Sequence, residues 1–165
     1  MKNDLDLVKI AEEEFTLNGG IHNAAHGISH WNRVKELGRY LAKHTGADTK
    51  VTDYFAYFHD LKRQNEDYDP QHGLRAAMLV KSLYEQGWNE LSQVQLGQLV
   101  YACTFHSHPN AKSEDVTIKT CWDSDRLDLW RVGIKPDPFL LNTAKAKEPE
   151  VIEFAKKLYE NWSKK

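Results

Sequence analysis

The sequence contains no apolar run that approaches the roughly 20 residues needed to cross a bilayer. Residues 1–6 carry charges of both signs and lack the apolar centre of a signal peptide. Cysteine is scarce, with only Cys103 and Cys121, both in apolar-rich segments. A disulfide between them stays open, but two buried, reduced thiols are the simpler expectation in a domain of this size. These features predict a cytoplasmic protein with no membrane partner.

Neither sign of charge is in large excess, because the formal net charge is -2. That balance gives no indication of a nucleic acid polymer as a partner. Hydrophobic residues make up 41% of the chain and charged residues 28%, which is typical of a globular protein. The 165 residues suit a single domain, 1–165, which can bury roughly two-thirds of the surface of the unfolded chain.

No segment alternates apolar and polar residues as a half-buried strand does, and no internal repeat is present. Apolar residues instead recur at helical spacing in every long segment. The sequence therefore predicts an all-α bundle of about six or seven helices. The expected helices cover residues 5–15, ended by 18–20; 29–42, capped by Ser29; a third opened by Thr52 or a neighbour and running into 59–60; 73–86; 91–105; 116–129; and about 150–162.

Histidine is the residue whose distribution needs an explanation. The chain has eight, and all but His44 fall into three stretches: 22–30, 59–72 and 106–108. Clustering of this kind raises the expectation of a metal site above that for scattered surface histidines.

Three segments carry residues that could bind a metal together. The doublet His59-Asp60 is weak evidence alone, because a buried histidine bonded to an aspartate is a common structural pair. His30 lies upstream on an expected helix and Asp125 downstream on another. This mixed set of nitrogen and oxygen ligands suits a divalent manganese, iron, cobalt or zinc ion, and magnesium less well.

In this order the segments resemble the HD-domain superfamily of metal-dependent phosphohydrolases. Its signature is a histidine, a His-Asp doublet and a distant aspartate. Here His30 begins the H-x-x-R-V segment, His59-Asp60 is the doublet and Asp125 opens the D-R-L segment, over about residues 20–135. The segments A-A-H-G-I-S-H-W-N-R-V and D-S-D-R-L-D look most like small bacterial members. The resemblance implies an HD-domain helical bundle with His30, His59, Asp60 and Asp125 as metal ligands.

Asp123 is a second carboxylate close to the implied ligand Asp125. On an ideal helix two residues correspond to about 200° of rotation, so only one of the pair can point straight at a given ion. The resemblance places the ligand directly before Arg-Leu, which is Asp125. Asp123 is therefore expected to support a ligand or the fold.

The resemblance also suggests residues that act on the substrate beside Asp60. Lys62 and Arg63 follow the doublet and could contact phosphate, or could be solvated surface charges. Some superfamily members hold a second metal with two additional histidines, a role open to His72 and His106. Contact with the substrate or with the ligands is the simpler role for these two. Arg63 also stands where nucleotidase-like relatives have a catalytic glutamate, so a general acid is not assigned among Glu66, Asp67 and the extra histidines.

These features predict a hydrolase of phosphate ester or pyrophosphate bonds in a small phosphorylated metabolite, with nucleotides as candidates. One alternative is a di-iron oxygenase acting on a small molecule, which would need ligands beyond the first four. Another is a metal-stabilised binding module without turnover. Trp130 and Trp162 could belong to the core or to the interface of a homodimer.

Overall fold

The computed structural model describes residues 4–17, 25–87 and 90–164, with the side chains of 4–7 excepted. The described residues form seven α-helices and two short 3-10 helices, and contain no strand, which confirms the predicted all-α bundle. The predicted end of the first helix, 18–20, lies outside the described residues. The helices are α1 (Asp4–Leu17), α2 (Ile28–Thr45), α3 (Thr49–Phe58), α4 (His72–Glu85), α5 (Gln93–Phe105), α6 (Val116–Leu127), η1 (Asp128–Val132), η2 (Pro138–Leu140) and α7 (Pro149–Trp162).

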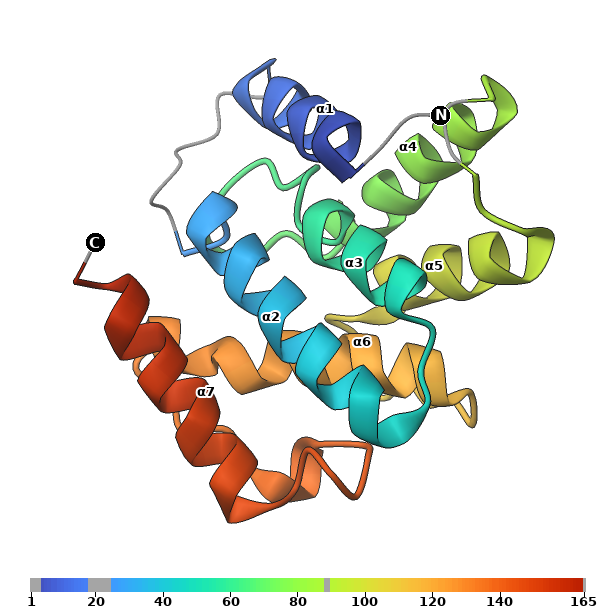
Figure 1. The fold of residues 1–165 in the computed structure, drawn as a ribbon. Helices are drawn as coiled ribbons and strands as arrows, with labels where there is room; N and C mark the ends of the chain where they lie inside the picture. The colour runs from blue at the N-terminus through green and yellow to red at the C-terminus, as the bar shows by residue number, and fades with distance from the viewer. Residues whose placement is uncertain (1–3, 18–24, 88–89, 165) are drawn as a thin grey trace.

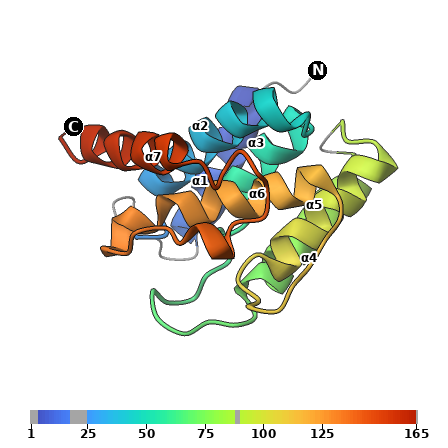
Figure 2. The same cartoon turned by 90° about the horizontal axis from the view of Figure 1, so that it is seen from below.

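The bundle is organised around α2 and α3, which pack side by side (Figure 1). α6 packs across both of them, and α4 and α5 form a second pair of neighbouring helices. α7 lies against α2 and η1 at the edge of the bundle, and the loop between α3 and α4 extends away from it (Figure 2). Among the described residues, no helix is both long enough and apolar enough to cross a membrane.

Two apolar clusters hold these helices together. The larger surrounds the fully buried Trp31, Phe55 and Trp122, from α2, α3 and α6. The smaller lies between α2, α6 and α7 and includes Leu37 and Val151. Burying each such side chain contributes roughly 1.5–3 kcal/mol. Because both clusters include α2, this helix is fixed from two sides.

The structure corrects two of the predicted helix starts. Gly27, not Ser29, is the residue before α2, and Ser29 lies inside the first turn. Asp48 caps α3 by accepting hydrogen bonds from the backbone N–H groups of Lys50 and Val51. Thr52 therefore lies within the helix, where its hydroxyl donates to a backbone carbonyl oxygen. Asp48 is the better residue for the position before the helix, because its carboxylate accepts hydrogen bonds from two backbone N–H groups.

Both cysteines are buried free thiols, as the sequence predicts. Trp31 and Trp122 are fully buried, whereas Trp130 and Trp162 are half-buried. Trp130 and Trp162 are therefore not part of the fully buried core.

Candidate metal centre

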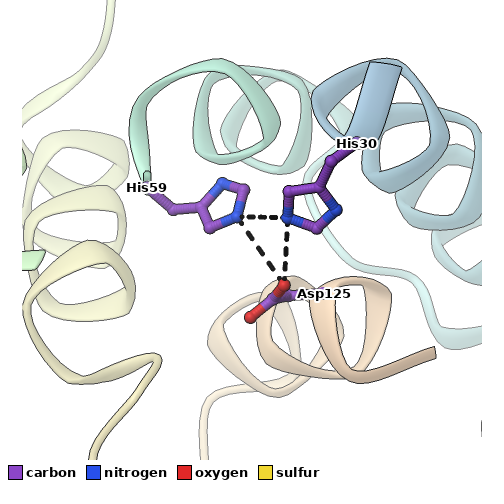
Figure 3. Close-up of side chains that lie close together, drawn as sticks. All are labelled: His30, His59 and Asp125. Carbon is purple, nitrogen blue, oxygen red and sulfur yellow. Dashed lines mark hydrogen bonds and ion pairs between the residues drawn. The ribbon is translucent and has the colours of Figure 1, made fainter. Parts of the chain in front are cut away.

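Four buried histidines meet where helix ends converge. His30 lies in the first turn of α2, His59 follows the last residue of α3, His72 opens α4 and His106 follows α5. His59 still has helical backbone angles and closes the last turn of α3, and Asp60 follows in the turn after it, so both side chains reach the same centre. Figure 3 shows His30 and His59 facing each other, with Asp125 of α6 beside them.

Each of these imidazoles is held by its Nδ1 atom. The acceptor is a backbone carbonyl oxygen for three of them and a carboxylate for His30. The pairs are His30 with Asp128 at 2.7 Å, His59 with the carbonyl of Phe55 at 2.9 Å, His72 with the carbonyl of Asp69, and His106 with the carbonyl of Cys103 at 2.7 Å. A carbonyl or carboxylate oxygen only accepts, so Nδ1 carries hydrogen and the neutral ring has its lone pair on Nε2.

We call His30, His59, Asp60 and Asp125 the first ligand group. The Nε2 atoms of His30 and His59 are 3.1 Å apart. Oδ2 of Asp60 lies 3.4 and 3.3 Å from them, and Oδ1 of Asp125 lies 3.3 and 3.7 Å from them. Ligands at about 2.1 Å from a cation are separated by roughly 3.0–3.4 Å in octahedral or tetrahedral geometry. Four of the five distances lie in this range and the fifth, 3.7 Å between His59 and Asp125, is slightly longer, so the group fits a divalent cation with a small side-chain adjustment.

The second ligand group consists of His72, His106 and the same Asp60. The two Nε2 atoms are 2.9 Å apart, and Oδ1 of Asp60 lies 3.1 Å from His72 and 3.4 Å from His106. Each oxygen of Asp60 thus faces a different pair of imidazoles. The possible ligand atoms of His30, His59 and Asp125 all lie within 4.8 Å of one another, and so do those of His59, Asp60 and His106.

The electrostatics of the first ligand group also favour a cation. Burial acts to lower the pKa of His59, but the neighbouring carboxylates of Asp60 and Asp125 outweigh it and raise the pKa to about 10. Burial likewise opposes ionisation of Asp60 and Asp125, yet the histidines hold both carboxyl pKa values well below their usual range. Oδ1 of Asp125 is buried and has no hydrogen-bond partner among the described residues. The residues therefore fit a divalent metal ion.

Asp128 supports this centre from behind and was missed at the sequence level. Its carboxylate accepts hydrogen bonds from Nδ1 of His30 at 2.7 Å and from Nε and Nη2 of Arg33 at 2.7 and 2.9 Å. Arg33 and His30 lie on one face of α2 because they are three residues apart. The same spacing separates Asp125 from Asp128, and that spacing was the signal available in the sequence.

Asp123 points to a different part of the molecule, as its position on α6 predicts. It is fully buried and accepts four hydrogen bonds from Asn142 and Thr143, two from backbone N–H groups and two from side chains. It therefore fixes the connection between η2 and α7. Asp125, in contrast, faces the histidines.

The basic residues after the doublet are divided between the centre and the surface. Nζ of Lys62 pairs with Glu14 of α1 at 3.0 Å, so the structure does not bring Lys62 into either ligand group. Nη1 of Arg63 lies 3.2 Å from Nε2 of His72 and 3.8 Å from Oδ1 of Asp60. Its Nε and Nη2 donate to backbone carbonyls of the α3–α4 loop. Arg63 thus borders the second ligand group while bracing that loop.

Glu66, one of the general-acid candidates, pairs with a histidine near the centre. Oε2 of Glu66 accepts a hydrogen bond from Nδ1 of His26 at 2.7 Å. Burial lowers the pKa of His26 despite this contact and the charge of Asp60. His108 lies outside both ligand groups and lines a cavity of about 420 Å³ that His106 also borders. The cavity is a place where the organic part of a small ligand could lie beside the centre.

Comparisons with known proteins support the fold. No protein-family model and no curated protein sequence matches the chain. The crystal structure of a predicted HD superfamily hydrolase from an uncultured Thermotogales bacterium matches with a TM-score of 0.67 and 23% sequence identity. The match covers 96% of this chain and 88% of that chain. The chain has the HD-domain fold. The resemblance seen in the sequence is thereby confirmed for the architecture.

Proposed function

We propose that the chain is a divalent-metal-dependent hydrolase of phosphate ester or pyrophosphate bonds in a small phosphorylated metabolite, with nucleotides as the first candidates. The observation that carries the proposal is the convergence of four buried imidazole Nε2 atoms on the two oxygens of Asp60. The protein of the same fold from the Thermotogales bacterium, a predicted hydrolase, is a second line of support.

In this proposal the first ligand group holds one ion and the second ligand group can hold another. A divalent ion bound here lowers the pKa of coordinated water and polarises a phosphoryl group. Manganese, iron, cobalt and zinc suit the nitrogen and oxygen ligands. Two bound ions would share Asp60, because each of its oxygens faces a different pair of histidines.

The chain itself contributes preorganisation and charge. Asp128 and the three carbonyl acceptors keep each Nδ1 protonated, so each Nε2 is presented toward the centre in one orientation. Arg63 adds positive charge beside Asp60, where a phosphoryl oxygen would gain negative charge.

The second ligand group also supports a different reaction, oxidation of a small molecule by two irons. Such a centre needs ligands beyond those of the first group, and His72 and His106 are correctly oriented to provide them. Hydrolysis is the main proposal. Measurements on the iron-loaded protein distinguish the hydrolase from the oxidase.

The test is a screen of metal-free protein reloaded separately with manganese, iron, cobalt and zinc. Phosphate release is measured over nucleotides and sugar phosphates, and oxygen consumption is measured for the iron form. We expect phosphate release that is lost in His59→Ala and kept in His44→Ala, a histidine of α2 outside both ligand groups. Oxygen consumption with two bound irons and no phosphate release would favour the oxidase. Neither activity with any metal would leave only a binding module.

A further inference from the structure

Arg131 is a buried guanidinium at the edge of the metal centre. It lies in η1, directly after α6, and its side chain is only 8% exposed. Nε and Nη1 have no hydrogen-bond partner among the described residues, and both are buried. Nη2 lies 3.7 Å from Oδ1 of Asp125, which is too long for a hydrogen bond.

The other guanidinium groups near the centre already have partners. Arg33 places Nε and Nη2 on the two oxygens of Asp128. Arg63 donates from Nε and Nη2 to loop carbonyls. A buried cation with free donors is costly unless an acceptor reaches it. Arg131 therefore differs from its neighbours in having hydrogen-bonding capacity for a ligand.

The position of Nη2 indicates where such a ligand would lie. A guanidinium binds an oxyanion with two parallel hydrogen bonds along one of two edges, Nε with Nη2 or Nη1 with Nη2. Arg33 uses the first edge on Asp128. Both edges contain Nη2, the atom of Arg131 that faces Asp125. An oxyanion on either edge is consequently held beside the first ligand group.

We propose that Arg131 binds oxygen atoms of an anionic tetrahedral group, the phosphoryl group of the substrate, beside the first ligand group. The assignment of that group to a substrate rests on the proposed function. Arg131, rather than Lys62, is then the cation that anchors the phosphoryl group. It is a substrate-binding residue that adds no metal ligand.

A simpler role for Arg131 is to neutralise Asp125, and the two roles predict different results. If Arg131 only pairs with Asp125, its removal changes manganese affinity and leaves anion affinity untouched. If it binds the phosphoryl group, its removal weakens anion binding and leaves the manganese content as in the parent protein.

The experiment measures the affinity of the manganese-loaded protein for inorganic phosphate by calorimetry, with no turnover required. Arg131→Gln should weaken phosphate binding by about 10- to 100-fold, the loss expected for charge-assisted hydrogen bonds. Arg131→Lys should lose less, because it keeps the charge but not the planar edge. Arg39→Gln, which removes a guanidinium of α2 that pairs with Asp53 of α3, should bind phosphate as the parent does.

Unchanged phosphate affinity in Arg131→Gln, or no measurable phosphate binding by the parent, overturns the proposal. If Arg131→Gln unfolds, Arg131→Lys decides, and parent-like affinity there also overturns it. Failure of the proposed function is distinguishable, because a parent protein that hydrolyses nothing can still show phosphate binding that depends on Arg131.

Discussion

The two ligand groups differ in the charge that surrounds them although they share Asp60. The first has a further carboxylate, Asp125, and burial fails to keep its histidines neutral, since the pKa of His59 is raised to about 10. The second has no carboxylate of its own beyond Asp60, and burial lowers the pKa of His106. The first group therefore attracts a cation strongly through two carboxylates, whereas in the second group burial disfavours protonation of His106.

This difference suggests unequal metal affinities at adjacent positions. Two carboxylates attract a divalent cation more strongly than one, while the lowered pKa of His106 reduces competition from protons in the second group. The first position should fill at lower metal concentration, and the second should depend on the first through the shared Asp60.

The largest expected effect comes from removing what the two groups share. Asp60→Ala should abolish metal binding at both positions together with any phosphate release, because a carboxylate ligand both neutralises charge and fixes geometry. Metal analysis of the purified variant, alongside a circular dichroism spectrum to verify folding, measures this. The control is Glu153→Ala, which removes an exposed carboxylate on α7. Full metal content in Asp60→Ala would show that Asp60 is no ligand.

The next effect separates the two carboxylates of α6. Asp125→Asn should lose metal affinity strongly. Asp123→Asn should keep its metal but lose about 1–3 kcal/mol of stability, since a buried charged acceptor of four hydrogen bonds becomes a neutral amide. Manganese titration and thermal unfolding of both variants decide. If Asp123→Asn is the variant that fails to bind manganese, Asp125 is not the metal ligand of α6.

The first ligand group and the fold class could be anticipated because each depends on local pattern. Helical spacing of apolar residues recurs throughout, and the three motif segments occur in a specific order. Even the division between Asp123 and Asp125 follows from the rotation of a helix. These features could be predicted because they depend on residues a few positions apart or on the order of known motifs.

What the sequence could not provide depends on long-range packing. Lys62 follows the doublet closely, yet it turns toward Glu14 because α1 packs against α3. Arg131 lies beyond the D-R-L motif and reaches Asp125 only because η1 continues α6 with a tighter turn. The sequence therefore cannot show that Arg131 is the buried cation with unpaired donors, because this depends on how the site packs.

A third prediction tests whether the first ligand group can bind metal without the second. His106→Ala should remove the weaker equivalent of metal while the first position still fills, because Asp60, His30, His59 and Asp125 remain in place. Stoichiometric titration with manganese, followed by calorimetry, distinguishes one bound equivalent from two. Loss of all binding in His106→Ala would mean that the second group controls the first.

A fourth, smaller effect tests the support behind His30. Asp128→Asn should lower manganese affinity by about 10- to 100-fold, the range for partners that orient a metal ligand. It also leaves the buried Arg33 without a charged partner, so the unfolding temperature should drop. Arg33→Gln separates the two causes, because it disturbs the ion pair but not the hydrogen bond that Nδ1 of His30 donates to Asp128. Parent-like manganese affinity in Asp128→Asn would show that metal binding does not depend on the hydrogen bond between His30 and Asp128.

The smallest effect concerns pH and the first ligand group without metal. Since the pKa of His59 rises from an ordinary 6.5 to about 10 in the folded protein, the protonated ring adds stability that is fully present below pH 6.5. That stability is lost as the pH rises toward 10. Asp60 and Asp125, with lowered pKa values, keep their contribution throughout this window. The unfolding temperature of chelator-treated protein should therefore decline between pH 6.5 and 9, while that of manganese-loaded protein declines less because the ion replaces the proton. Parallel curves for the two forms would contradict competition between proton and metal at His59.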